Sequence, residues 1–220
     1  MSGVKRIVLI HATRVAIDPI EAAFRALWPG AETVSILEEG LSADLALGRT
    51  TRKALDARIV ALADYAMGLA PDGILYTCSS FGNGIEAAAK RLPIPVLKPN
   101  EAMFDTAIQL GGQVVMLYSF PPAKEGMEQE FAAVAGSRAT LRSVFVPEAL
   151  DALKAGDAAT HDRLVAEAAA QVRDVDAIML AHFSMSRAGD AARARTAIPV
   201  LTSPETAIRR MQELTGGRSC

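Results

Sequence analysis

Cys78 and His182 are the two residues of this sequence whose types and positions could carry protons in a reaction. Each follows a short apolar run, Gly73-Ile-Leu-Tyr-Thr before the cysteine and Ala177-Ile-Met-Leu-Ala before the histidine. A thiolate can remove a proton, and an imidazole can accept or deliver one near neutral pH. An enzyme that inverts a carbon centre needs one such group on each side of that carbon.

The stretches around these two residues read as copies of each other. The first runs from Asp72 to Glu101 and the second from Asp176 to Glu205, with a constant offset of 104 residues. Both contain the segment Ile-Pro-Val-Leu, at residues 94–97 and 198–201. A repeat of this length indicates a duplicated α/β unit rather than a short solenoid repeat. We expect equivalent strand ends of the two copies to face one cleft from opposite sides.

Cys78 lies where the first apolar run turns polar, with Thr77, Ser79 and Ser80 beside it. The helix predicted to follow would direct free N–H groups and the positive end of its dipole at this place. Such an environment lowers the pKa of a thiol and favours a carboxylate ligand. We therefore predict a reactive thiol, and a buried structural cysteine is the alternative.

His182 holds the equivalent place in the second copy, and this alignment is the reason to consider it catalytic rather than structural. Other side chains fall at predicted strand ends, where Thr13 and Ser119 could hydrogen-bond a carboxylate. Arg14 could pair with an anionic group, although a surface contact is the commoner case for an exposed arginine. The predicted substrate-binding residues are His11, Thr13, Arg14, Thr77, Ser79, Ser80, Tyr118, Ser119, Phe183 and Ser184.

Several kinds of site are not supported by the sequence. With three histidines in total and no Cys/His cluster, we expect no metal site. There is no GxGxxG or Walker loop for a nucleotide and no G-x-S-x-G nucleophile elbow. Glu101 and Glu205 recur at the repeat offset, and we interpret each as an acid in the first turn of a helix, where it complements the helix dipole.

Short apolar runs alternate with helix-like patterns along the chain. This alternation predicts an α/β protein with buried parallel sheets, in which ligands bind beyond the carboxyl ends of the strands. Residues 38–51 are expected to form a long loop that could border the cleft. The predicted strands are 7–11, 33–37, 73–77, 96–98, 114–119, 143–146, 178–182 and 200–202. The predicted helices are 54–69, 84–91, 102–110, 124–135, 161–172 and 205–214.

The repeat divides the chain into two lobes. One is expected to span residues 1–98 and to take back the last helix, residues 205–220, and the other to span residues 99–204.

Half of the 220 residues are apolar, and the formal net charge is −2. This composition supports a full core and argues against a nucleic-acid partner. No run is long enough to span a membrane, so we expect a cytoplasmic protein, and two cysteines do not suggest a disulfide framework.

On these residues the chain resembles the aspartate/glutamate/hydantoin racemase superfamily over nearly its whole length. The segments that carry the resemblance are 72–80, 98–102, 176–182 and the two Ile-Pro-Val-Leu runs. The resemblance implies two pseudo-symmetric α/β lobes, an active site in the cleft between them, no cofactor and a small carboxylate substrate. Family members usually have one cysteine per lobe, one removing the α-proton and the other reprotonating the opposite face. Cys78 matches the first cysteine, and His182 stands where the second is expected.

Three functions remain open at this point. The first is a cofactor-independent racemase or epimerase of amino acids or their derivatives in which Cys78 and His182 both transfer protons. The second uses Cys78 alone, in a decarboxylase or a cis–trans isomerase, because the superfamily also includes arylmalonate decarboxylases and maleate isomerases. The third is a carboxylate-binding relative without catalysis. The sequence does not identify the substrate and leaves open whether the chain forms a homodimer.

Overall fold

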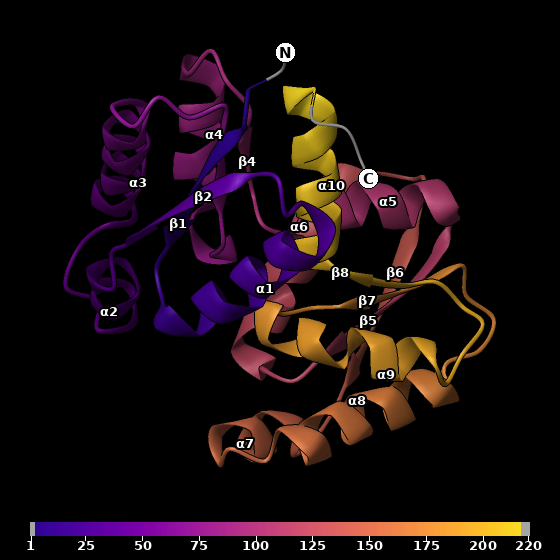
Figure 1. The fold of residues 1–220 in the computed structure, drawn as a ribbon. Helices are drawn as coiled ribbons and strands as arrows, with labels where there is room; N and C mark the ends of the chain where they lie inside the picture. Colours follow the sequence, from indigo (N-terminus) through magenta and orange to yellow (C-terminus); the bar gives the residue numbers. More distant parts are fainter. Residues whose placement is uncertain (1–2, 217–220) are drawn as a thin grey trace. The chain divides into compact units, whose positions relative to one another are not determined.

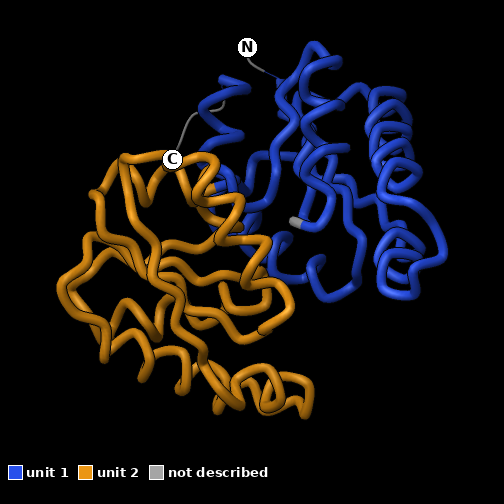
Figure 2. The backbone as a smooth tube through the Cα atoms, turned by 180° about the vertical axis from the view of Figure 1, so that it is seen from behind, with its two compact units in different colours: residues 1–101, 207–220 blue, residues 102–206 orange. Residues whose placement is uncertain are grey.

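The computed structural model describes residues 3–216, apart from the side chain of Ser79. The chain forms two compact units (Figure 2). Unit 1 comprises residues 1–101 and 207–220, and unit 2 comprises residues 102–206. The expected lobe boundaries lie within three residues of this division. No helix among residues 3–216 is both long and apolar enough to cross a membrane.

Unit 1 contains a four-stranded parallel sheet in the order β2-β1-β3-β4. Its strands are β1 (Arg6–His11), β2 (Glu32–Leu37), β3 (Gly73–Tyr76) and β4 (Val96–Leu97). The central strands are buried on both faces, as their continuous apolar runs predict. Because β1 and β3 are paired in parallel, their carboxyl ends lie next to each other, and the residues after them lie at one edge of the sheet.

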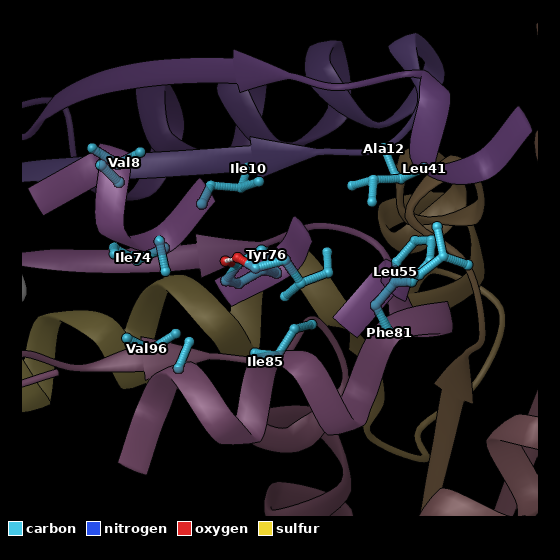
Figure 3. Close-up of a cluster of buried hydrophobic side chains, with 14 residues drawn as sticks. Val8, Ile10, Ala12, Leu41, Leu55, Ile74, Tyr76, Phe81, Ile85 and Val96 are labelled. Atoms are coloured by element: carbon cyan, nitrogen blue, oxygen red, sulfur yellow. Dashed lines mark hydrogen bonds between the residues drawn. The ribbon is translucent and has the colours of Figure 1, made fainter. Parts of the chain in front are cut away.

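Helices cover both faces of this sheet. On one face lie α2 (Gly40–Ala46), α3 (Arg52–Met67) and α4 (Gly82–Arg91). Figure 3 shows apolar side chains of β1, β3 and β4 packed together with Leu55 of α3 and Ile85 of α4. On the other face lie α1 (Ile17–Leu27) and the part of α10 (Ser203–Thr215) that belongs to unit 1. These two helices are joined by a hydrogen bond of 3.3 Å from Gln212 Nε2 to the Leu27 carbonyl.

Unit 2 repeats this architecture with the strand order β6-β5-β7-β8 (Figure 1). Its strands are β5 (Gln113–Tyr118), β6 (Thr140–Phe145), β7 (Ala177–Leu180) and β8 (Val200–Thr202), and all of the pairings are parallel. One face packs against α7 (Ala149–Lys154), α8 (Ala158–Gln171) and α9 (Gly189–Arg193). The other face packs against α5 (Glu101–Leu110) and α6 (Lys124–Ala135).

The two units match in detail as well as in topology. In each, an aspartate at the start of the repeat accepts a hydrogen bond from the backbone of the unit's first strand. The Arg6 N–H donates to Asp72 Oδ2, and the Gln113 N–H donates to Asp176 Oδ2, both over 2.9 Å. The predicted fold of two α/β lobes, each with a parallel sheet flanked by helices, is therefore confirmed.

The predicted elements are present, with one clear error. All eight strands and all six helices lie within three residues of the predicted bounds. The loop expected over residues 38–51 is wrong in part, because residues 40–46 form α2. Gly40 and Ser42 are typical of loops, but Leu41 is completely buried in the core of unit 1, and this packing outweighs the local preference. Helices α1, α7 and α9 were not predicted; α7 and α9 are only six and five residues long.

Candidate active-site residues

Cys78 lies just beyond the carboxyl end of β3. The Thr77 N–H donates a hydrogen bond of 3.0 Å to the Ile10 carbonyl, which extends the pairing of β1 and β3 by one residue. The backbone of Cys78 is extended, with φ −123° and ψ 123°, and a short 3₁₀ turn (Ser79–Phe81) begins directly after it. The cysteine is half-buried and packs against the core of unit 1. The sulfur therefore sits at the strand edge where ligands of parallel sheets bind.

His182 holds the same backbone position in unit 2. The Ala181 N–H donates a hydrogen bond of 2.9 Å to the Leu117 carbonyl, which extends the pairing of β5 and β7. His182 has φ −124° and ψ 149°, and the 3₁₀ turn Phe183–Ala188 begins after it. The thiol and the imidazole are thus displayed from equivalent strand ends of two equivalent units.

The electrostatic environment of Cys78 differs from the prediction. Burial raises the pKa of the thiol above its ordinary value, and hydrogen bonds from Ser80 oppose this only in part. The expectation of a lowered pKa is wrong because the 3₁₀ turn separates Cys78 from the first turn of α4, where the helix dipole acts most strongly. Desolvation of the thiolate therefore dominates, and the thiol is neutral near pH 7.

His182 is also held in its neutral form. Burial lowers the pKa of its imidazole to about 4. Its Nε2 atom is buried and has no hydrogen-bond partner among the described residues. The ring of Phe120 stands edge-on to the imidazole, with 6.4 Å between the ring centroids. An imidazole in this state has a free lone pair or a free N–H at Nε2, depending on the tautomer, and can accept or donate a proton there.

His11 does not fit the predicted role of a direct substrate ligand. It is completely buried, and both ring nitrogens are occupied within unit 1. Nδ1 lies 2.8 Å from Thr77 Oγ1, and Nε2 lies 3.2 Å from Ser35 Oγ. Burial lowers its pKa to about 4. His11 therefore holds Thr77, the residue before Cys78, rather than presenting a free atom to a ligand.

The remaining predicted residues of unit 1 occupy different environments. Arg14 is exposed and paired with Glu39 through two hydrogen bonds of 3.1 and 2.8 Å, which matches the surface contact considered above. Thr13 is partly buried, and Ser80 is exposed. The side chain of Ser79 lies outside the described residues. Arg52 was not predicted as a site residue; its Nη1 donates a hydrogen bond of 2.6 Å to the Ser80 carbonyl and holds the turn after Cys78.

The strand ends of unit 2 carry aromatic side chains instead. Tyr118 is nearly buried and its ring lies 5.4 Å from that of Phe145, and Phe183 is buried. Phe120 and Phe145 are 46% and 44% exposed, so large apolar surfaces are available next to His182 and Tyr118. Phe120 was not predicted as a site residue, although its position two residues after the predicted Tyr118 could have indicated it.

Two predicted serines of unit 2 also lie at this edge. The Oγ atom of Ser119 is buried without a hydrogen-bond partner among the described residues, and Ser184 is partly buried. A buried hydroxyl without a partner is unfavourable, and a ligand or an ordered water would satisfy it. Among residues 3–216, with the Ser79 side chain set aside, no group of three or more His, Cys, Asp or Glu side chains is arranged to hold a metal ion.

Comparison with known proteins identifies the family of this fold. The family model of the Asp/Glu/hydantoin racemases matches residues 7–173, which include Cys78. The chain belongs to this family. His182 lies beyond the matched range, within the second copy of the repeat. A search by sequence among curated proteins finds no significant match.

Solved structures of this family share the fold at low sequence identity. The chain is similar to allantoin racemase from Klebsiella pneumoniae, with a TM-score of 0.74, 16% identity and coverage of 96% of this chain and 88% of that one. Aspartate racemase from Picrophilus torridus is similar with a TM-score of 0.72 and 15% identity, and the match covers 98% of this chain and 96% of that one. An unliganded arylmalonate decarboxylase is similar with a TM-score of 0.69 and 17% identity, and the match covers 98% of this chain and 94% of that one. These likenesses establish the two-unit fold of racemases and a decarboxylase for this chain.

Proposed function

We propose that this protein is a cofactor-independent racemase or isomerase that moves a proton at a carbon next to a carboxylate or carbonyl. Cys78 and His182 are the two groups that exchange protons with that carbon. One observation carries the proposal: in a fold of the racemase family, a thiol and an imidazole occupy the same backbone position at equivalent strand ends. The substrate is a small carboxylate or carbonyl compound, such as an amino acid or a derivative of one.

The protonation states at rest determine which group acts first. With the thiol protonated and the imidazole neutral, His182 is the base and Cys78 is the acid. The C–H bond breaks, its proton goes to His182, and its electron pair delocalises into the adjacent carboxylate or carbonyl as an enolate. The S–H bond of Cys78 then supplies a proton to the opposite face. This leaves an imidazolium and a thiolate, which is the state needed for the reverse direction.

The enolate needs hydrogen-bond donors near its oxygens. The backbone N–H groups that follow Cys78 and His182 begin the two 3₁₀ turns, and they are suited to this role in our proposal. The hydroxyls of Thr13 and Ser119 are further donors, and the buried Ser119 hydroxyl has no partner among the described residues. The apolar surface of Phe120 favours a substrate with an apolar substituent on the side of His182.

A second candidate function uses Cys78 alone as the proton donor, in a decarboxylase or a cis–trans isomerase. The raised pKa of the thiol favours this alternative, because a thiol that stays protonated near pH 7 can protonate an enolate directly. In that case His182 orients or binds the substrate without exchanging a proton with it.

Deuterium exchange in the single variants separates the two functions. Aspartate, glutamate, allantoin and an arylmalonate are incubated with the protein in D₂O to find a substrate. His182→Asn is expected to stop racemisation while Cys78 still exchanges the α-proton of one enantiomer. In Cys78→Ala, His182 is expected to exchange the α-proton of the other enantiomer only. Racemisation that persists in His182→Asn at the wild-type rate would reject two-base catalysis.

A further inference from the structure

A pocket of about 320 Å³ opens in unit 1 between α4 and β4. It is separate from Cys78 and is lined by charged side chains on an apolar floor. Glu86, Ala89 and Lys90 contribute from α4, Val96 from β4, and Glu101 from the first residue of α5. Lys98 also lines the pocket, and its Nζ lies 2.9 Å from Glu86 Oε1.

In unit 2, an arginine side chain occupies the equivalent place. The repeat offset of 104 residues pairs Ala89 with Arg193. Arg193 Nη1 donates to Asp190 Oδ1 over 2.9 Å and to Glu205 Oε1 over 3.1 Å, and Nη2 donates to Glu205 Oε2. Its Nε donates to the Val200 carbonyl over 3.2 Å. The guanidinium is therefore held by two carboxylates and one carbonyl of unit 2.

All three of these acceptors have counterparts in the pocket of unit 1. The same offset pairs Asp190 with Glu86, Glu205 with Glu101, and Val200 with Val96. These counterparts all line the pocket. An Ala89 side chain ends at Cβ, so unit 1 keeps the acceptors of a guanidinium and lacks the guanidinium itself.

The backbones of the two units agree closely enough for this comparison. The Ile74 N–H donates to the Pro95 carbonyl and the Ile178 N–H to the Pro199 carbonyl, each over 2.9 Å, at the repeat offset. Ala88 and Ala192, the residues before Ala89 and Arg193, are both completely buried in their cores. The strands and helices that frame the pocket are therefore in the same register in both units.

The two carboxylates of the pocket differ in their ion pairing. Lys98 holds the pKa of Glu86 below its ordinary value, so that carboxylate is already partly neutralised. Glu101 makes no ion pair within the described part of the chain. A planar guanidinium can donate hydrogen bonds to both oxygens of such a carboxylate at once, whereas an ammonium group cannot match this geometry.

From this internal comparison we propose that the pocket of unit 1 binds the guanidinium group of a ligand. Glu101 binds it through two parallel hydrogen bonds, and Glu86 and the Val96 carbonyl complete the site. The guanidinium comes from a free alkylguanidinium compound or from an arginine side chain of a second copy of this chain. The proposal does not depend on the racemase reaction.

Calorimetry with methylguanidinium chloride tests the site, with methylammonium chloride at the same ionic strength as the control cation. Methylguanidinium is expected to bind wild-type protein at one site. Glu101→Gln is expected to weaken this binding about tenfold or more, because it removes the charge from the paired hydrogen bonds. Equal binding of the two cations, or no effect of Glu101→Gln, would overturn the proposal.

Three variants test the comparison of the two units: Ala89→Arg and Arg193→Ala exchange their features, and Ala89→Met is the control. Ala89→Arg places the missing guanidinium in unit 1, so it is expected to abolish methylguanidinium binding and to raise the melting temperature. Ala89→Met fills the pocket without charge and is expected to abolish binding without that stabilisation. Arg193→Ala opens the second pocket and is expected to raise the stoichiometry from one site to two. Binding that survives in Ala89→Arg would show that methylguanidinium binds elsewhere and would overturn the proposal.

Sedimentation over a range of protein concentrations distinguishes the sources of the guanidinium. A dimer that dissociates on adding methylguanidinium, and that Ala89→Arg does not form, indicates an arginine from a second copy. A mass that stays constant while methylguanidinium binds indicates a free small molecule. Neither binding nor dissociation in wild-type protein would reject both sources.

Discussion

The two units of this protein have the same backbone at their functional strand ends and different side chains around them. Around Cys78 in unit 1 the neighbours are hydroxyl side chains, and Arg52 holds the turn that follows the cysteine. Around His182 in unit 2 they are aromatic rings, notably Phe120. In both units burial keeps the functional group neutral, raising the pKa of the thiol and lowering that of the imidazole. The duplicated scaffold therefore determines the position of each proton-transfer group, and the neighbouring side chains determine its protonation state at rest.

The largest expected effect tests whether the two positions are functionally equivalent. Replacing His182 with Asn removes one proton-transfer group, so racemisation is expected to fall by about 10²–10⁴. Replacing it with Cys puts a thiol at both positions and is expected to recover much of that loss. Racemisation rates of the wild type, His182→Asn and His182→Cys, followed by polarimetry, measure the loss and its recovery. A His182→Cys variant as inactive as His182→Asn would contradict the equivalence of the two positions.

The aromatic surroundings of unit 2 are expected to determine the pH range of activity. His182 acts as a base only while it is neutral, and its pKa is lowered to about 4. The acid limb of kcat/KM is therefore expected near pH 4 rather than near the ordinary histidine pKa of about 6.5. Phe120→Ser admits water to the imidazole and should move this limb upward. Phe145→Ser, which removes a ring that packs against Tyr118, is the control and should leave the limb unchanged.

The buried histidine of unit 1 makes stability depend on pH. The pKa of His11 is about 4 in the folded protein and about 6.5 when unfolded, so the unfolded chain binds a proton first as pH falls. This stability is fully present above pH 6.5 and is lost progressively towards pH 4, by about 3 kcal/mol. Urea unfolding at several pH values measures the slope. His11→Gln should reduce the slope and leave the part that comes from the similarly lowered pKa of His182. An unchanged slope would show that His11 is not held neutral.

The smallest expected effects concern the turns that follow the two functional residues. In unit 2 the turn is held by Arg187, whose Nε lies 2.9 and 3.2 Å from the oxygens of Asp162. In unit 1 it is held by Arg52 through the Ser80 carbonyl. Because both arginines are exposed, Arg187→Ala and Arg52→Ala are each expected to cost about 1 kcal/mol or less of unfolding free energy. A few-fold decrease in kcat with little change in KM would identify them as positioning residues.

Much of the architecture could be predicted from short-range patterns. Short runs of three to six residues identified the strands, and the constant offset identified the duplication. The same offset placed Cys78 and His182 at equivalent positions. The short helix α2 escaped prediction because Gly40 and Ser42 resemble a loop, and the burial of Leu41 that stabilises it depends on residues distant in sequence.

The sequence by itself determined the α/β class, the two-fold repeat and the pair of residues at matching strand ends. The tertiary structure decided their protonation states, the internal pairing of His11 with Thr77, and the empty place beside Ala89. The reason is physical. Strand and helix patterns are properties of consecutive residues, whereas desolvation and pocket shape depend on side chains that folding brings together from separate parts of the chain.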